Sequence, residues 1–150
     1  MNREDEGRSL NIEQPSSSVL FKQTKVLPVV IVIPAFNEEE TIHKTLESLK
    51  QQTCLAEEII VVDDCSSDKT GSVAKSYGST VIRTPKNTGN KAKAQSFALP
   101  FLKSKYVISI DADTILKEDA VEKMFKFMEL HPDTSACCNF VLPQKIETIW

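Results

Sequence analysis

Short runs of β-branched and other apolar residues alternate along this chain with segments of helical periodicity, and this alternation constrains the fold more than any other feature. Residues 29–33 read Val-Val-Ile-Val-Ile, a continuous run typical of a strand that is covered on both faces. Further strand candidates lie at residues 58–63, 80–83 and 106–110. Strands that alternate with helices favour a mostly parallel sheet, because a helix returns the chain between parallel neighbours.

The segments between these strands predict helices. Ile42, Leu46 and Leu49 recur at the spacing of one helix face, and Asn37 is a candidate cap for that helix. We expect further helices within residues 66–78, 91–99 and 118–130, and a fifth strand at residues 135–142. The sequence therefore predicts an α/β, Rossmann-like fold with a mostly parallel sheet and helices on both faces.

The length of 150 residues suits one domain with one hydrophobic core. Residues 1–25 are polar, include the acidic triplet Glu4-Asp5-Glu6 and lack sustained periodicity. We expect them to form a disordered or loosely docked tail. Residues 26–150 are then the folded part of the chain.

Charge and hydropathy exclude several classes of protein. The net charge is −3 and no long basic run is present, which argues against nucleic-acid binding through clustered lysine and arginine. The amino terminus has no apolar signal-peptide core, and no apolar run approaches the roughly 20 residues that span a bilayer. We therefore expect a cytoplasmic protein without a transmembrane segment, whose four cysteines are reduced thiols.

Polar turns follow the four predicted strands. They span residues 34–39, 63–68, 84–91 and 111–114, and three of them carry carboxylates. In open sheets of this class, ligands bind outside the carboxyl ends of the strands. A sheet edge that gathers acids and a lysine beside a glycine turn predicts a site for a phosphorylated ligand and a metal ion.

Asp111 and Asp113 lie two residues apart, so in an extended segment their side chains point the same way. Mg²⁺ and Mn²⁺ prefer oxygen ligands, usually one or two carboxylates together with substrate phosphates. The pair is therefore a candidate metal site that would neutralise a departing diphosphate. A solvated turn at the strand end is the alternative, because such acidic pairs are frequent by chance.

Other turn residues are candidates for nucleotide binding. The carboxylates of Asp63, Asp64 and Glu38 can accept hydrogen bonds from the N–H edge of a base or from ribose. Lys91, near a predicted helix start, can contact phosphate oxygens as a point charge. Two structural alternatives remain open at this point: Asp64 as a cap of the following helix, and Lys91 as an exposed surface lysine.

Four segments, taken together, resemble the family-2 inverting glycosyltransferases, which have the GT-A fold of nucleotide-diphospho-sugar transferases. They read VIVIPAFNE at residues 30–38, IIVVDDCSSDKT at residues 59–70, NTGNKAKA at residues 87–94 and DADT at residues 111–114. Their order and spacing agree with the family over residues 29–130. The last segment is similar to the family's DxD motif. Four matches in order are far more specific than any single one.

The resemblance implies a glycosyltransferase that moves a sugar from a nucleotide-diphosphate donor, usually a uridine derivative, to an acceptor hydroxyl with inversion. The acceptor would be a saccharide or a lipid-linked saccharide, in a parent protein at the cytoplasmic face of the membrane. The nucleotide-sugar site it implies comprises Pro34, Ala35, Asn37, Glu38, Asp63, Asp64, Lys91, Asp111, Ala112 and Asp113. Asp111 and Asp113 would hold Mg²⁺ or Mn²⁺, with Asp113 binding the metal more directly.

The chain also departs from the family pattern. Cys65 stands where glycine is usual, so that turn must tolerate a Cβ atom. An inverting transfer needs a carboxylate that takes the acceptor proton, and the family's base lies well past the DxD motif. We find no matching segment before Trp150. We therefore expect a donor-binding half that is truncated before its base, and that does not transfer sugar by itself.

Three alternatives are weighed against this interpretation. Phosphatases of the haloacid dehalogenase class also place DxD after an apolar strand, but their other motifs lie further downstream than this chain reaches. Receiver domains carry an acidic pair after their first strand, whereas Asp63 and Asp64 follow the second. A non-catalytic nucleotide-binding module, or an inert fragment, is compatible with the resemblance and with the missing base.

Overall fold

The computed structural model describes residues 25–138, which form a four-stranded parallel sheet with the order β3-β2-β1-β4. The strands are β1 (Lys25–Ala35), β2 (Cys54–Asp63), β3 (Thr80–Arg83) and β4 (Tyr106–Ser109). Every pair of neighbouring strands is parallel. The predicted parallel α/β sheet is therefore confirmed, with β1 in its interior.

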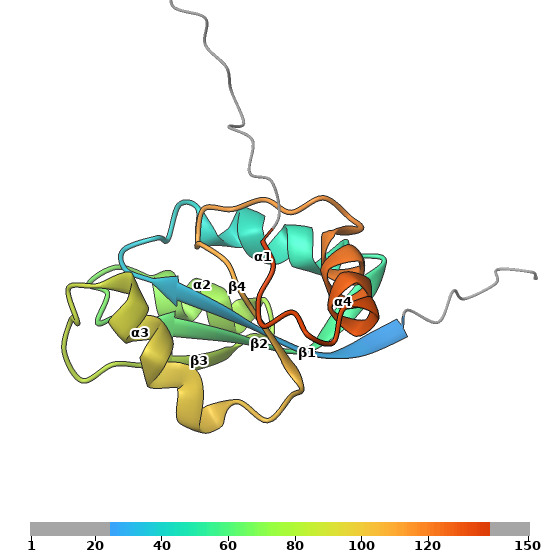
Figure 1. Cartoon of the computed structure of the whole chain (residues 1–150). Coiled ribbons are helices and arrows are strands. Elements are labelled where there is room, and N and C mark those ends of the chain that lie inside the picture. Colours follow the sequence, from blue (N-terminus) through green and yellow to red (C-terminus); the bar gives the residue numbers. More distant parts are fainter. Residues whose placement is uncertain (1–24, 139–150) are drawn as a thin grey trace, which may run out of the picture.

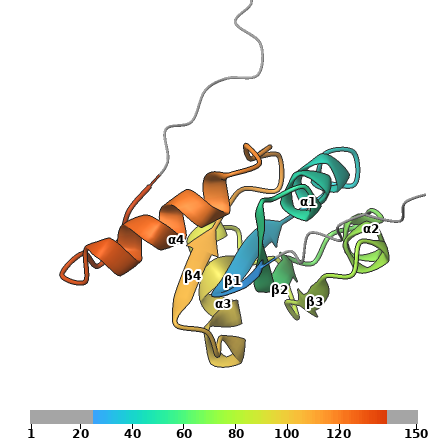
Figure 2. The ribbon, with the colours of Figure 1, turned by 90° about the vertical axis from the view of Figure 1, so that its right-hand side faces the viewer.

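Helices cover both faces of this sheet, as predicted (Figure 1). The helices are α1 (Ile42–Lys50), α2 (Thr70–Ser76), α3 (Lys91–Ala98) and α4 (Ala120–Leu130), and the 3₁₀ turn η1 (Leu99–Phe101) extends α3. Figure 2 shows α1, α2 and α4 on one side of the strands and α3 on the other. Within residues 25–138, no helix is both long and apolar enough to cross a lipid bilayer.

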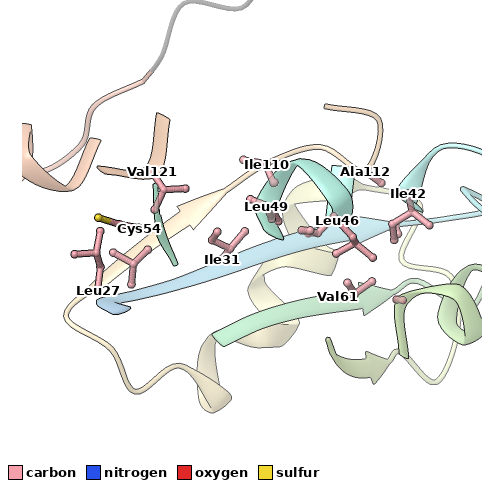
Figure 3. Packing of buried hydrophobic residues seen from close by; sticks show 14 residues of the cluster. Leu27, Ile31, Ile42, Leu46, Leu49, Cys54, Val61, Ile110, Ala112 and Val121 are labelled. Carbon is pink, nitrogen blue, oxygen red and sulfur yellow. The ribbon is translucent and has the colours of Figure 1, made fainter. Parts of the chain in front are cut away.

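Strand β1 is buried because its side chains pack against helices on both faces of the sheet. Ile31 and Ile33 contribute to the larger core, together with Leu46 of α1 and Val121 of α4 (Figure 3). On the opposite face, Val30 and its neighbours pack against the small side chains of α3. Alternation along one strand thus supplies both cores, which explains the continuous apolar run.

One local prediction is wrong, and a second is contradicted over the residues that the structure describes. Asn37 does not cap α1: the helix begins at Ile42, and Asn37 adopts a positive φ of 55° in the turn before it. Its side-chain oxygen instead accepts a hydrogen bond from the Ser67 amide, 2.8 Å away. Residues 135–138, the described part of the predicted fifth strand, are irregular. Of the predicted tail at residues 1–25, residues 1–24 lie outside the described residues and Lys25 begins β1; the chain from residue 139 also lies outside them.

The turn after β2 shows how Cys65 is accommodated. Cys65 has a φ of 63°, in the left-handed region where a Cβ atom crowds the backbone and glycine is preferred. The amide of the neighbouring Ser66 is held by the Asp63 carboxylate at 2.8 Å, and the Asp64 amide is held by the Ala35 carbonyl at 2.8 Å. One local and one tertiary hydrogen bond therefore hold the residues on either side of Cys65 in this turn.

Replacing Cys65 by glycine should raise the free energy of unfolding by about 1 kcal/mol, because left-handed strain of about 1–2 kcal/mol is relieved and part of the gain is lost to the freer unfolded chain. Urea denaturation followed by circular dichroism measures the difference. Cys65→Ala is the matched control, since it removes the thiol and keeps the Cβ atom. Equal stabilities of the glycine and alanine variants would contradict the strain argument.

Candidate functional site

A cavity of about 430 Å³ opens at the carboxyl edge of the sheet, where the ligand site was predicted. Its walls come from the turns after β1, β2 and β4 and from the loop that leads into α3. Eight of the ten predicted binding residues line it: Pro34, Ala35, Glu38, Asp64, Lys91, Asp111, Ala112 and Asp113. Four segments that are far apart in the sequence therefore converge on one space.

The sheet itself positions the acidic turn after β4. The Ile110 amide donates to the Val32 carbonyl at 3.2 Å, so the chain follows β1 beyond the last paired residue of β4. Ala112 is buried in the core, and its carbonyl accepts a hydrogen bond from the Thr45 hydroxyl of α1 at 2.7 Å. Asp111 and Asp113, on either side of Ala112, both line the cavity. The Thr114 amide donates to the Asp111 carbonyl at 3.1 Å, so the acidic pair lies in a turn and not in the extended segment that its spacing assumed.

The turns after β1 and β2 are joined by reciprocal hydrogen bonds. The amide of Asn37 donates to the Ser66 hydroxyl at 3.0 Å, and the amide of Glu38 donates to the Thr70 hydroxyl at 2.8 Å. In return, the Lys69 amide donates to the Glu39 carboxylate at 2.8 Å. These contacts hold the first turn against the start of α2, so the Glu38 side chain has a defined place in the cavity wall.

Asp64 is buried, and its carboxylate is held by two threonines of the loop before α3. One oxygen accepts from the Thr84 hydroxyl at 2.9 Å, and the other accepts from the Thr88 hydroxyl at 2.8 Å. The Thr88 amide donates to both oxygens, at 2.9 and 3.1 Å. Burial raises the pKa of Asp64, but these hydrogen bonds outweigh it, so the pKa lies below its ordinary value. Asp64 is thus an ionised acceptor that tethers the loop.

Asp63 and Asn37 are the two predicted binding residues that do not line the cavity. The buried carboxylate of Asp63 accepts from the Ser66 amide at 2.8 Å and from the Arg83 guanidinium at 2.5 Å. A Cβ atom at Gly71 would come within 2.8 Å of this carboxylate, so glycine leaves the room it needs. The Asn37 oxygen is used by Ser67. Both side chains join neighbouring turns, and their contact with a nucleotide stays a prediction.

Lys91 and Asp111 form an ion pair at the cavity wall, with 2.8 Å between Nζ and Oδ1, and each side chain is about half exposed. Asp113 has no hydrogen-bond or ion-pair partner among residues 25–138. The cavity is therefore lined by four carboxylates and one ammonium group. Its charge is negative unless a cation or a protonated group joins it.

The free oxygens of the acidic turn suit a hard divalent cation, which prefers carboxylate ligands. Within the described part of the chain, however, no group of three or more histidine, cysteine or acidic side chains is arranged to hold a metal. Asp111 and Asp113 can supply part of a coordination sphere, and the remaining ligands have to come from water or from a bound molecule.

Sequence analysis missed several wall residues. Phe36 is about half exposed and presents an aromatic side chain to the cavity. Asn87 supports the loop, because its side-chain oxygen accepts from the Gly89 amide at 2.7 Å. Asn90 caps α3 through the Ala92 amide at 2.8 Å. All three lie inside the segments that carry the family resemblance, and an aromatic residue directly after Pro34-Ala35 was the signal for the first.

Comparison with known proteins shows the family of this chain. The model of the family described as Glycosyl transferase family 2 matches residues 30–150. The poly(ribitol-phosphate) beta-N-acetylglucosaminyltransferase TarP of Staphylococcus aureus is 33% identical over 105 residues, which cover 66% of this chain and 32% of TarP. The 4,4'-diaponeurosporenoate glycosyltransferase of the same species is 36% identical over 107 residues, which cover 68% of this chain and 28% of the relative.

Solved structures show the same fold. The crystal structure of residues 1–349 of S. aureus TarS superposes with a TM-score of 0.66 at 26% identity, over 71% of this chain and 33% of that fragment. Two further structures of that fragment contain UDP and UDP-GlcNAc. The chain thus spans about one third of the length of these relatives. The match sets aside the phosphatase and receiver-domain alternatives, and the chain belongs to glycosyl transferase family 2.

Proposed function

We propose that this chain holds the donor of a glycosyltransferase, a nucleotide-diphosphate sugar whose nucleotide part is uridine diphosphate. The observation that carries the proposal is the single cavity in which Glu38, Asp64, Lys91, Asp111 and Asp113 meet at the carboxyl edge of the sheet. Ligands of open α/β sheets bind at this edge. The UDP and UDP-GlcNAc complexes of the similar TarS fragment support this choice of nucleotide.

We place the base and ribose at the end of the cavity formed by the first two turns. The exposed ring of Phe36 offers a face on which a base can stack. Asp64 is ionised and has three donors on its two oxygens, which leaves acceptor capacity for an N–H group of the base. Glu38 lines the same wall and can accept from a ribose hydroxyl.

The diphosphate would lie between Lys91 and the acidic turn. A diphosphate is strongly anionic, and the four carboxylates of the cavity would repel it. A divalent cation on Asp113 and Asp111 offsets this repulsion, and the phosphate oxygens complete the coordination that the protein lacks. When bound, this cation stabilises charge on the departing nucleotide diphosphate. Lys91 can then exchange its contact with Asp111 for one with phosphate.

For the reaction, we propose transfer to an acceptor hydroxyl with inversion. Such a transfer needs a base that accepts the proton of that hydroxyl. Each cavity carboxylate already has a donor-side role in this proposal, so none of the four is left to act as this base. The part of the chain described here then binds and orients the donor, and a non-catalytic nucleotide-binding module is the alternative that shares the same cavity.

Isothermal titration with UDP, with and without Mn²⁺, tests the donor site. Mn²⁺ should strengthen UDP binding at least tenfold, since it removes the repulsion between diphosphate and carboxylates. Asp113→Asn should abolish most of this gain. Asp133→Asn, an exposed residue outside the cavity, is the control and should bind as the native chain does. A UDP affinity that changes neither with Mn²⁺ nor with the Asp113 substitution would contradict the proposal.

Lys91→Met should distinguish the contact of this lysine with Asp111 from its proposed contact with phosphate. Without nucleotide, Mn²⁺ should bind up to about fivefold more tightly, because a competing ion pair of up to about 1 kcal/mol is removed. UDP binding in the presence of Mn²⁺ should weaken, because a phosphate contact is lost. Electron paramagnetic resonance counts free Mn²⁺ in each case. Lys86→Met is the control, because Lys86 lies on the same loop but does not line the cavity. We expect Mn²⁺ binding to strengthen and UDP binding to weaken in Lys91→Met, and neither to change in Lys86→Met.

Thr88→Val removes the hydroxyl that donates to the Asp64 carboxylate and keeps the shape of the side chain at position 88. The pKa of Asp64 is lowered in the folded chain, so its stabilisation is present above the unfolded pKa near 4 and is lost as pH falls through the lower folded pKa. The variant should be less stable by about 1.5–3 kcal/mol at pH 7, and the deficit should shrink as pH falls below about 4.

Urea denaturation over a pH series measures this deficit. Ser96→Ala is the control, because the Ser96 hydroxyl donates to the Ala92 carbonyl and has no carboxylate partner. Its deficit should be independent of pH. A Thr88→Val deficit that stays constant from pH 7 to acid would show that the hydroxyl does not stabilise an ionised Asp64.

A further inference from the structure

An apolar tip projects from the face of the molecule opposite the larger core. Helix α3 ends at Ala98 and continues into η1, where Pro100 prevents further helical hydrogen bonding. Figures 1 and 2 both show this turn pointing away from the layer of α1, α2 and α4. Leu99 is 62% exposed and Phe101 is 49% exposed. We call Phe97, Leu99 and Phe101 the η1 tip.

The second core does not use these side chains. Under α3 the sheet is covered by Ala94 and Ala98, and the adjoining Leu102 turns inward to pack against the same cluster. The residues of the η1 tip lie on the other side of the turn and remain in solvent. Large apolar side chains gathered on a projecting turn are a candidate interaction surface.

The sequence around the tip is basic, although two acids from other segments, Glu57 and Glu129, contact the residues that follow it. From residue 69 to residue 110 the sequence has eight lysines or arginines and no acid, although the whole chain has a net charge of −3. Lys93 and Lys103 are the exposed lysines beside the tip, and within residues 25–138 neither forms an ion pair. Lys105 is paired with Glu129, and Ser104 donates to Glu57. The tip thus joins apolar groups to unpaired cations.

We propose that the η1 tip docks the protein on an anionic lipid bilayer, with Leu99 and Phe101 entering the headgroup region and Lys93 and Lys103 facing lipid phosphates. Apolar side chains combined with flanking lysines favour such a surface, because both the interface and the anionic headgroups attract them. This inference stands independently of the proposed donor site.

The size of the tip argues for lipid over other partners. Three side chains present at most a few hundred Å², whereas a stable protein interface buries about 800 Å² on each partner. A nucleic acid would use the lysines and gain nothing from exposed Leu99 and Phe101 on its phosphate backbone. A small apolar tip can insert into the headgroup region of a bilayer. Each lysine near an anionic bilayer increases the partitioning of the protein onto it about fivefold.

Vesicle flotation with the full chain tests the proposal. The chain should float with vesicles of phosphatidylcholine and phosphatidylserine, and should stay in solution with phosphatidylcholine alone. Leu99→Ser/Phe101→Ser and Lys93→Glu/Lys103→Glu should each lower partitioning at least tenfold. Both pairs of positions are exposed, so circular dichroism and the melting temperature should show that the fold is retained.

Two matched controls locate the effect. Leu130→Ser alters a side chain that is 75% exposed on α4, and Lys44→Glu alters an exposed lysine on α1. Both helices lie on the other face, so these variants should float as the native chain does. Flotation lost on charge reversal but retained in Leu99→Ser/Phe101→Ser would overturn the proposal in favour of an anionic polymer site. An equal loss in the controls, or no flotation of the native chain, would also overturn it.

Discussion

Parallel pairing of β1 with both of its neighbours is the constraint on which the rest of this molecule depends. Ile31 of β1 is paired in register with Ile59 of β2 and with Ile108 of β4, and the three strands run in the same direction. Their carboxyl ends therefore release their turns at one edge. Because β1 is buried on both faces, a slip of one residue would exchange its two cores, which pins the register.

The edge becomes a defined cavity only because the turns are tied together. Two adjacent acids at the end of β2 hold different neighbours: Asp63 binds Arg83 and a turn amide, and Asp64 binds the threonines of the loop before α3. A third connection runs from Thr45 of α1 to the acidic turn. Each of these connections joins elements that are distant in sequence, so the cavity depends on the whole sheet being formed.

The fold was predictable from the sequence because its signal is local and repeated. Apolar runs and helix faces recur along the chain, and the strand at residues 80–83 coincides with β3. Most of the cavity was predictable for the same reason, since strand ends of a parallel sheet must meet. The different roles of Asp63 and Asp64 were not, because adjacent residues on a strand point to opposite sides. In the structure Asp64 lines the cavity, and Asp63 is bonded to Arg83, 20 residues away.

The prediction that Asn37 caps α1 was wrong for a related reason. Asn37 is a good cap by residue type, but its turn is bonded to the turn after β2, and its side chain serves the Ser67 amide. Tertiary contacts thus override the local preference of a residue at the same edge where the cavity forms. The exposed η1 tip could not be foreseen either, since the sequence does not show that α3 covers the sheet with alanines and leaves Phe97, Leu99 and Phe101 exposed.

Helix α3 connects the two surfaces that carry the proposals. Its first residue, Lys91, lines the cavity, and its last leads into the η1 tip. Eight helical residues rise about 12 Å, so the tip and the cavity wall at Lys91 lie about one short helix apart. Membrane docking would then occur at one end of α3 and donor binding at the other. The two would be coupled by the geometry of one rigid helix, without a conformational change.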